Sequence, residues 1–437
     1  MDLNGIKEDF SYSAAMKICL KDDLIKKITI GSSYRFTGII VNAISTFNKK
    51  LLLEPMFEAV QVCNKTVSVP PRTLCDPYSN IWKLQKEYNN SPWRLSAKLS
   101  LDFGVDVAPS GSYFLLKLGI LLSIVASRSD HRWSKNISYS KTKLHILTVG
   151  ENSLAIERLF KLGSLLGERA VYKTTNTELI ADFSTTWHNH HNHWVYGAGA
   201  LALADSGICL MYDLNFQRKE DKEALWKVME DSSITVEIPR KYKGECLTDK
   251  QTHILYPLAC TVWSSSANRL IGISESLVRQ FNLVIPVNDS ICEGSKSVRI
   301  DLANNVVTSN NSCEQFRLKP IDYNTLINLA SEFEVQFPND ARALVEQYIL
   351  ARRQSLFDCQ LNITFPLNAI NTVWVCKEDV ILAIWLNEET ILSMYGQSDL
   401  MLSSNCYTTT NTIVDTQEIW LQQFSVHLST FLANFNS

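Results

Sequence analysis

Residues 144–157 have the layout of a phosphate-binding loop, but the side chains that would do the chemistry are of the wrong type. The segment LHILTVG predicts a buried parallel strand ending at Gly150, and a helix is predicted to begin near Leu154. A working loop needs a lysine for the β- and γ-phosphates and a Ser or Thr hydroxyl for Mg²⁺. The chain has Ile156 and Glu157 at these two positions. The sequence therefore predicts a nucleotide-binding frame that has lost its phosphate ligands.

The segments that follow resemble the minichromosome maintenance (MCM) AAA+ family. GAGALALADSGICLMYDL and WKVMEDSSITVEIP carry the resemblance, and FNLVIPVND and ARALVEQYILARRQS extend it over residues 92–395. It implies an α/β fold with an AAA+ (P-loop NTPase-like) core built on a parallel sheet, a helical lid domain, and a partial OB-like β region at the N-terminus. Because the ATP site is degraded, the chain is most similar to the insect meiotic MCM-like proteins within the family.

The resemblance also implies where the other catalytic groups should stand. An ATP-hydrolysing strand ends in two acids, of which one holds Mg²⁺ and the other polarises the attacking water. In CLMYDL these positions fall on Tyr212 and Asp213, so only one carboxylate is kept. In LACTVWSSSAN, residues 264–266 are serines where a water-orienting amide is expected, unless Asn268 takes that role.

The position of the family's arginine finger is altered as well. The family's SRFD aligns with residues 279–282, which places the finger on Gln280, with Arg279 next to it. These two residues are the candidates for contact with a neighbouring subunit. Together, the losses remove nearly every group that positions a transferring phosphate. We therefore expect no catalytic residues, no ATP hydrolysis and no bound ATP cofactor.

Composition and charge exclude several classes of protein. The 437 residues are 46% hydrophobic and 20% charged, which is typical of a globular chain with two to three domains. A formal net charge of −3 argues against a surface that holds nucleic acid non-specifically. The cysteines form no CxxC pair, and Cys209 and Cys260 lie in apolar runs typical of buried reduced thiols. With no leader and no apolar run of membrane-spanning length, an intracellular compartment is expected, and the resemblance implies the nucleus.

Composition shifts and the resemblance together suggest the domain boundaries. A proline-rich segment, VSVPPRTLCDPYSN, marks a linker between the N-terminal region and the core, and a polar segment after FNLVIPVNDS joins core to lid. The predicted parts are a partial OB-like region (1–68), a linker (69–91), a degenerate MCM AAA+ core (92–290), a connecting loop (291–325), a helical lid (326–396), and a polar segment with a C-terminal helix (397–437).

Two further segments carry residue types that bind ligands elsewhere. The N-terminal GSSYRFTGIIV resembles part of an OB-fold. Basic and aromatic residues near it are candidate contacts for single-stranded DNA, namely Lys26, Lys27, Tyr34 and Arg35. A solvated strand edge is the favoured interpretation of this segment.

The tract WHNHHNHW has a metal-binding composition but no acidic or thiol partner, so we expect no metal site there. The zinc ribbon of full MCM proteins is missing.

The function implied by the resemblance is that of a non-hydrolysing MCM-like subunit or scaffold. It would act with MCM paralogues in a hetero-oligomer, in meiotic homologous recombination, double-strand-break repair and crossover formation, with contact to single-stranded or recombination-intermediate DNA. Two alternatives stay open: a divergent DNA-dependent ATPase or helicase that uses displaced groups, and a single-stranded DNA-binding module without a motor.

Overall fold

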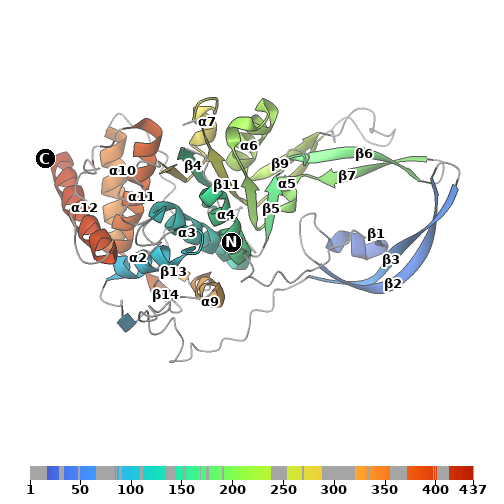
Figure 1. Ribbon diagram of the computed structural model, residues 1–437, viewed down its shortest axis with the longest axis horizontal. Helices are drawn as coiled ribbons and strands as arrows, with labels where there is room; N and C mark the ends of the chain where they lie inside the picture. The colour runs from blue at the N-terminus through green and yellow to red at the C-terminus, as the bar shows by residue number, and fades with distance from the viewer. Residues whose placement is uncertain are drawn as a thin grey trace, which may run out of the picture. The chain divides into compact units, whose positions relative to one another are not determined.

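The chain forms two compact units in the computed structural model. Figure 1 colours the chain by residue number. One unit comprises residues 1–68 and 181–198, and the other comprises residues 69–180 and 199–437. The residues that the structure describes are 17–28, 34–47, 50–64, 84, 86–87, 91–108, 112–133, 143–150, 154–167, 169–173, 177–188, 191–237, 253–267, 270–287, 320–331, 334–354, 372–396, 398, 400 and 413–436.

A parallel sheet of five strands forms the centre of the larger unit, in the order β12-β4-β11-β8-β5. The strands are β4 (Ile146–Gly150), β5 (Ala170–Lys173), β8 (Ile208–Met211), β11 (Thr261–Ser266) and β12 (Leu283–Val287). β8 and β11 are buried along their whole length, as expected for strands covered on both faces. The strand order reverses at β4, so the crevice beyond the carboxyl ends of β4 and β11 is where such sheets bind ligands.

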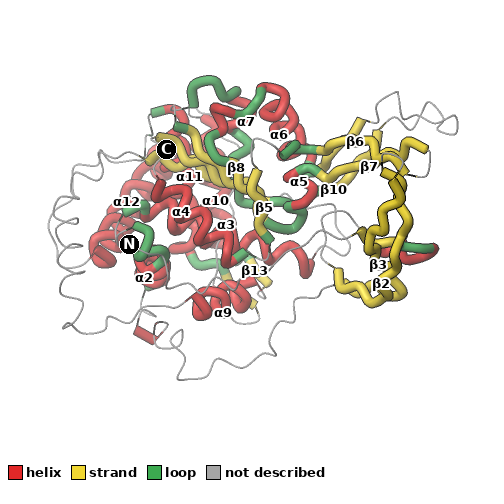
Figure 2. The backbone as a smooth tube through the Cα atoms, turned by 45° about the vertical axis from the view of Figure 1, so that its right-hand side comes forward, coloured by secondary structure: helices red, strands yellow, loops and turns green. Residues whose placement is uncertain are grey.

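Two long helices pack against this sheet, α3 (Phe114–Trp133) and α4 (Leu154–Leu166) (Figure 2). Trp263 of β11 is fully buried beneath them, and its ring stacks on that of Phe160 in α4, with centroids 5.6 Å apart. Its indole N–H donates to Ser123 Oγ of α3 at 2.7 Å. The helices approach closely at Gly163, where an added Cβ would lie 2.5 Å from Ile120.

Shorter elements connect the sheet to the rest of this unit. β9 and β10 form an antiparallel hairpin, and β13 and β14 pair in parallel. α9 packs on α3 and α4. The bounds are α2 (Pro92–Asp102), α5 (Ala200–Leu203), η2 (Leu214–Phe216), α6 (Lys219–Asp231), β9 (Ser233–Glu237), β10 (His253–Pro257), α7 (Glu275–Val278), α9 (Pro320–Ser331), β13 (Glu334–Gln336) and β14 (Thr372–Trp374).

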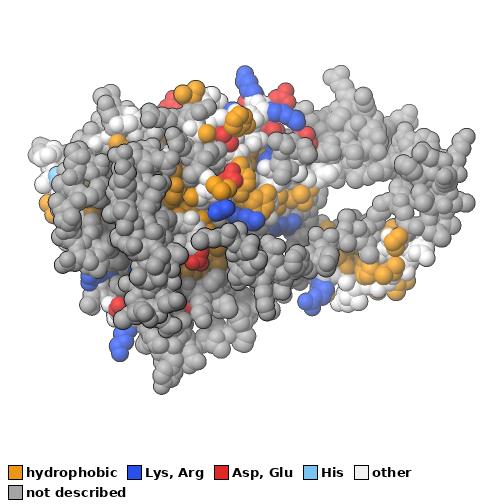
Figure 3. Space-filling view, in the orientation of Figure 1, with side chains coloured by type: hydrophobic (Ala, Val, Ile, Leu, Met, Phe, Trp, Pro, Cys, Tyr) orange, Lys and Arg blue, Asp and Glu red, His pale blue; other side chains and the backbone are white. Residues whose placement is uncertain are grey.

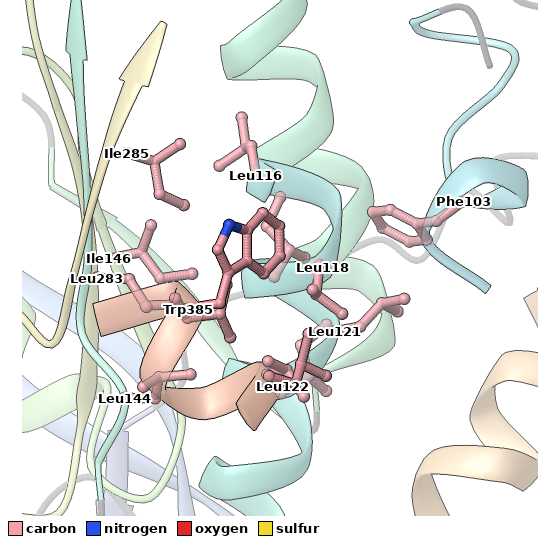
Figure 4. Packing of buried hydrophobic residues seen from close by; sticks show 14 of the residues in the cluster. Phe103, Leu116, Leu118, Leu121, Leu122, Leu144, Ile146, Leu283, Ile285 and Trp385 are labelled. Carbon is pink, nitrogen blue, oxygen red and sulfur yellow. The ribbon is translucent and has the colours of Figure 1, made fainter. Parts of the chain in front are cut away.

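Three C-terminal helices complete the larger unit: α10 (Asn339–Gln354), α11 (Lys377–Tyr395) and α12 (Ile413–Asn436). α11 lies along the edge strand β12, where Thr390 Oγ1 accepts a hydrogen bond from the backbone N–H of Val284 at 3.3 Å. The Trp385 indole of α11 lies near Leu116 of α3 and Ile285 of β12 in the hydrophobic core (Figure 4). The core therefore continues from the sheet into the lid, and α12 packs on α2, α10 and α11.

A buried ion pair joins α10 to α11. Arg352 and Glu388 are almost fully buried, and the Arg352 guanidinium donates to both carboxylate oxygens, including Nε to Oε1 at 2.8 Å. The Tyr348 hydroxyl and Ser398 Oγ also donate to this carboxylate. The guanidinium lies 5.7 Å from the ring centroid of Phe431 in α12, so one charge contacts three helices.

The smaller unit contains a sheet with the order β1-β3-β2. β1 (Lys17–Cys19) and η1 (Asp22–Lys27) precede a long hairpin of β2 (Tyr34–Phe47) and β3 (Lys50–Asn64). A second hairpin, β6 (Ala181–His188) with β7 (His191–Ala198), belongs to the same unit. An OB-fold is a five-stranded barrel, and the described residues give one sheet of three strands, so the OB-like assignment stays a prediction.

Several sequence predictions are confirmed here. β4 ends at Gly150 and α4 begins at Leu154, as the apolar pattern indicates. Cys209 and Cys260 are buried free thiols, and burial raises the pKa of Cys209 to about 12. None of the helices within the described ranges combines the length and the apolar character that a membrane crossing requires. The predicted domain boundaries stay predictions.

The buried ion pair predicts a large, site-specific loss of stability. Replacing Arg352 with Met should lower the free energy of unfolding by about 3–5 kcal/mol, because the Glu388 carboxylate would remain buried without its cation. Arg353→Met is the matched control, since Arg353 is exposed on the same helix turn and should change stability by less than about 0.5 kcal/mol. Urea unfolding of both variants measures the difference. Equal losses would contradict this role for Arg352.

Candidate functional site

The predicted phosphate site lies at the carboxyl edge of β4, and Gly150 is required there by packing. Gly150 has φ +141°, a conformation that side-chain-bearing residues rarely adopt. A Cβ at this position would lie 1.9 Å from the carbonyl oxygen of Val287, its partner in β12. The glycine is therefore explained by the close approach of two strands, without any phosphate.

Ile156, at the lysine position, is part of the hydrophobic core. Its side chain is 2% exposed and belongs to the core cluster, with Leu159 and Phe160 buried on the same face of α4. Residues three, four and seven apart share a helix face, so the spacing of Ile156, Leu159, Phe160 and Gly163 orients this face inward. A lysine at position 156 would have to bury its ammonium group or move this turn of the helix. The position that the resemblance aligns with the phosphate-binding lysine is thus occupied by a packing residue.

Tyr212, at the position of the first metal-binding acid, fills its site with an aromatic ring. Its ring stacks on that of Tyr172 at the end of β5, with centroids 6.4 Å apart and planes inclined by 25°. The Tyr172 hydroxyl is 2.7 Å from Ser164 Oγ of α4. Burial, together with the charges of Tyr172 and Glu157, raises the pKa of Tyr212 to about 12. The position that the resemblance assigns to a metal-binding acid is therefore occupied by a neutral, stacked phenol.

Asp213 keeps a carboxylate, but this group caps a turn. The residue is 7% exposed and has φ +42°, in the left-handed region. Its side chain accepts a hydrogen bond from the backbone N–H of Asn215 at 3.1 Å, which makes Asp213 the N-cap of η2. Its own backbone N–H donates to Ser265 Oγ at 3.0 Å. These contacts account for a short, acceptor-bearing side chain at this position.

The serines of β11 tie that strand to the end of β8. Ser264 Oγ donates to the backbone carbonyl of Met211 at 2.7 Å, and Ser266 Oγ accepts from the side-chain amide of Asn215 at 3.0 Å. All of residues 264–266 are buried. The hydroxyls that replace the expected amide therefore stabilise the β8–η2 connection, and Asn268, the alternative amide, lies outside the described residues.

Comparison with known proteins agrees with this frame. Residues 111–309 match the MCM P-loop domain. The Homo sapiens Minichromosome maintenance domain-containing protein 2 is 26% identical over 466 residues, covering 96% of this chain and 65% of the relative. Its Mus musculus counterpart is 24% identical over 462 residues, covering 96% of this chain and 64% of the relative. The Arabidopsis thaliana Probable DNA helicase MCM9 is 26% identical over 229 residues, covering 50% of this chain and 34% of the relative.

The chain contains a divergent MCM P-loop domain. The five-stranded parallel sheet and the helices packed on it form an α/β AAA+ core. The chain spans 65% of the human relative's length, so it covers less than two thirds of that protein. Within this domain, Ile156 packs in the core, Tyr212 stacks on Tyr172, and Asp213 caps η2.

The MCM finger position lies at the opposite, amino edge of the sheet. Arg279 follows α7, and its side chain is 44% exposed and forms an ion pair with Glu275 at 2.7 Å. The hydrogen bond to Glu275 is the main cause of the raised pKa of Arg279, and Tyr395 at the end of α11 adds to it. Gln280 lines a pocket below β12. Over α6 and α7, Figure 3 shows side chains of both charges next to apolar ones, so this surface is mixed in character.

The remaining candidate residues lie in the smaller unit. Lys27 and Arg35 are exposed, and Tyr34 is half-buried with its ring 6.1 Å from that of Phe36. The side chain of Lys26 lies outside the described residues, as do the side chains of His188, His190, His191 and His193. His188 and His191 pair at the end of the β6–β7 hairpin. DNA contact and the expected lack of a metal there both stay predictions.

Sequence reasoning missed two groups that shape the site. Tyr172 and Ser164 had no motif to mark them, although an aromatic residue at the carboxyl end of a neighbouring parallel strand is a usable signal. It also missed His145 and Asn282 at the amino edge, which bind each other through the His145 backbone N–H and Asn282 Oδ1 at 2.7 Å.

The capping role of Asp213 predicts a specific pattern of stability. Asp213→Ala should lower the free energy of unfolding by about 1–2 kcal/mol, because the cap is lost and alanine is strained at a positive φ. Asp213→Asn should stay within about 0.5 kcal/mol of wild type, because asparagine accepts the same hydrogen bond and tolerates this backbone conformation. Urea unfolding separates the two. If both substitutions destabilised the protein equally, the charge rather than the cap would be what matters.

Proposed function

We propose that this chain is a non-hydrolysing MCM-like subunit or scaffold, which neither binds ATP as a cofactor nor turns it over. The observation that carries the proposal is the burial of Ile156, 2% exposed, at the position of the phosphate-binding lysine. Loss of a ligand by itself leaves an open site, whereas here an apolar side chain has joined the core. The stacked Tyr212 and the capping Asp213 support the same interpretation.

The electrostatics of the site also favour this proposal. ATP-hydrolysing sites bring cations to the phosphates, because the transferring group carries several negative charges. Glu157 adds an anion at the metal-binding hydroxyl position, close enough to raise the pKa of Tyr212. Lys173, at the end of β5, lies 3.8 Å from Asp221 in an ion pair that is mostly buried. Phosphate would therefore meet an anion and an already paired cation.

The cellular role proposed here is meiotic homologous recombination. The chain would promote double-strand-break repair and crossover formation in the nucleus, together with MCM paralogues in a hetero-oligomer. Support comes from its match to the MCM P-loop domain and from its similarity, along most of its length, to the MCM domain-containing proteins of human and mouse. Contact with single-stranded or recombination-intermediate DNA would involve Lys26, Lys27, Tyr34 and Arg35.

The proposal predicts that ATP turnover is absent. Purified full chain with Mg²⁺-ATP should release phosphate no faster than the buffer, both with and without single-stranded DNA, because the groups that stabilise the transferring phosphoryl are missing. Asp213→Asn is the matched variant, since it removes the carboxylate that remains at the end of β8 and keeps the cap of η2. Turnover that depends on DNA and is lost in Asp213→Asn would support the rival function, a divergent DNA-dependent ATPase or helicase.

A second prediction concerns the subunit interface. If the amino edge contacts a neighbouring MCM subunit, Arg279→Ala should weaken co-purification with an MCM paralogue, or the paralogue's ATPase, by about tenfold. The unfolding midpoint should stay near wild type, because an exposed ion pair such as Arg279–Glu275 contributes little stability. Arg342→Ala, at an exposed arginine of α10, is the control. A mutant that assembles and supports partner ATPase normally would remove Arg279 from the interface.

A further inference from the structure

A small pocket opens at the amino edge of the AAA+ sheet, on the opposite edge from the degenerate nucleotide site. Its volume is about 80 Å³, more room than a single water molecule needs. His145, Cys260 and Asn282 directly precede β4, β11 and β12, and all three line it. The other lining residues are Lys143, Val228, Met229, Ser232, Leu258, Val262 and Gln280.

His145 is held in the pocket as a neutral hydrogen-bond donor. Its Nδ1 accepts a hydrogen bond from the backbone N–H of Val262 at 2.9 Å. The imidazole proton is therefore on Nε2. Complete burial, and then the charge of Lys143, lowers the pKa of His145 to about 3, so the ring stays neutral at physiological pH.

Asn282 presents its amide in a fixed orientation. Its Oδ1 accepts from the backbone N–H of His145 at 2.7 Å, so the other end of the side-chain amide, the NH₂ group, is left to donate. Gln280 and Ser232 add an amide and a hydroxyl to the lining. The polar groups that the pocket offers are thus mainly donors.

Lys143 supplies a positive charge to the same pocket. It is 8% exposed, and its charge contributes to the lowered pKa of His145. Burial raises the pKa of Cys260 well above its usual value, the charges of Cys209 and Asp205 also raise it, and the charge of Lys143 opposes this rise. None of the ten described residues that line the pocket is an aspartate or a glutamate. The last turn of α6 adds only partial negative charge from its backbone carbonyls, and its acids Glu230 and Asp231 are exposed.

We propose that this pocket binds a single oxyanion group, of the size of phosphate or carboxylate. An ammonium group together with amide, imidazole and hydroxyl donors is the set that recognises such a group, since charge-assisted hydrogen bonds are the strongest of those available. Free inorganic phosphate and a carboxylate share this chemistry. The site lies at the other edge of the sheet from Gly150, Ile156 and Tyr212, and among its lining residues only Gln280 is one of the altered ATPase positions.

The test compares oxyanions on the 437-residue chain at constant ionic strength and pH. Addition of millimolar potassium phosphate, in exchange for chloride, should raise the unfolding midpoint of wild type by about 1–3 °C, because a ligand of the folded state stabilises it by mass action. Potassium acetate is the second arm. A shift with both salts indicates a general oxyanion site, and a shift with phosphate alone indicates a phosphate site.

Matched variants separate binding from general salt effects. Phosphate also stabilises proteins by exclusion from their surfaces, and that effect would be the same in every variant. Lys143→Met should lose the shift, whereas Lys219→Met, which removes an exposed charge on α6, should keep it. If Lys143→Met does not fold, Gln280→Leu at the half-buried lining position replaces it and should reduce the shift at least twofold. A wild type that does not respond to either oxyanion, or a full shift in the variant tested, would overturn the assignment.

Discussion

The placement of Trp263 is the constraint on which both the core and the carboxyl edge of β4 depend. Its indole is fully buried, stacks on Phe160 of α4, and donates to Ser123 of α3. Ser123 in turn donates to the backbone carbonyl of Leu144, just before β4, at 2.7 Å. One side chain thereby fixes the central strand, two helices and the strand that carries the loop. Because α4 is held in this way, its inward face is set, and Ile156 lies on that face.

The same frame explains why the altered residues at the carboxyl edge are compatible with a stable fold. Charged side chains that contact a bound nucleotide would lower the stability of the fold if they were buried here and no nucleotide were bound. Here the lysine position is apolar and buried, the metal-binding acid is an aromatic ring stacked on Tyr172, and the remaining carboxylate caps η2. Each replacement removes a charge or gives it a local hydrogen-bond partner. The core therefore does not need ATP to satisfy its polar groups.

The sequence predicted the strands and the helix around the candidate site better than the side-chain contacts within it. The apolar run ending in Gly150 was sufficient to locate β4 and the start of α4, because a strand buried on both faces has a clear composition. β8 was located through the family resemblance of CLMYDL. The stacking of Tyr212 on Tyr172 could not be predicted, since it joins strands that are adjacent only through the sheet order. The cap at Asp213 depends on a positive backbone φ at this residue, and the presence of an aspartate in the sequence does not predict that conformation. The grouping of the β6–β7 hairpin with the N-terminal sheet likewise depends on contacts distant in sequence.

The most direct test of this account is equilibrium binding of ATP to the purified full chain. A titration with a fluorescent ATP analogue in the presence of Mg²⁺ measures it, with ADP as competitor. The account predicts no saturable binding up to about 1 mM nucleotide, which corresponds to a binding free energy weaker than about −4 kcal/mol. Saturable binding with a micromolar Kd that ADP competes away would contradict it, because the crevice would then hold phosphate despite Ile156 and Tyr212.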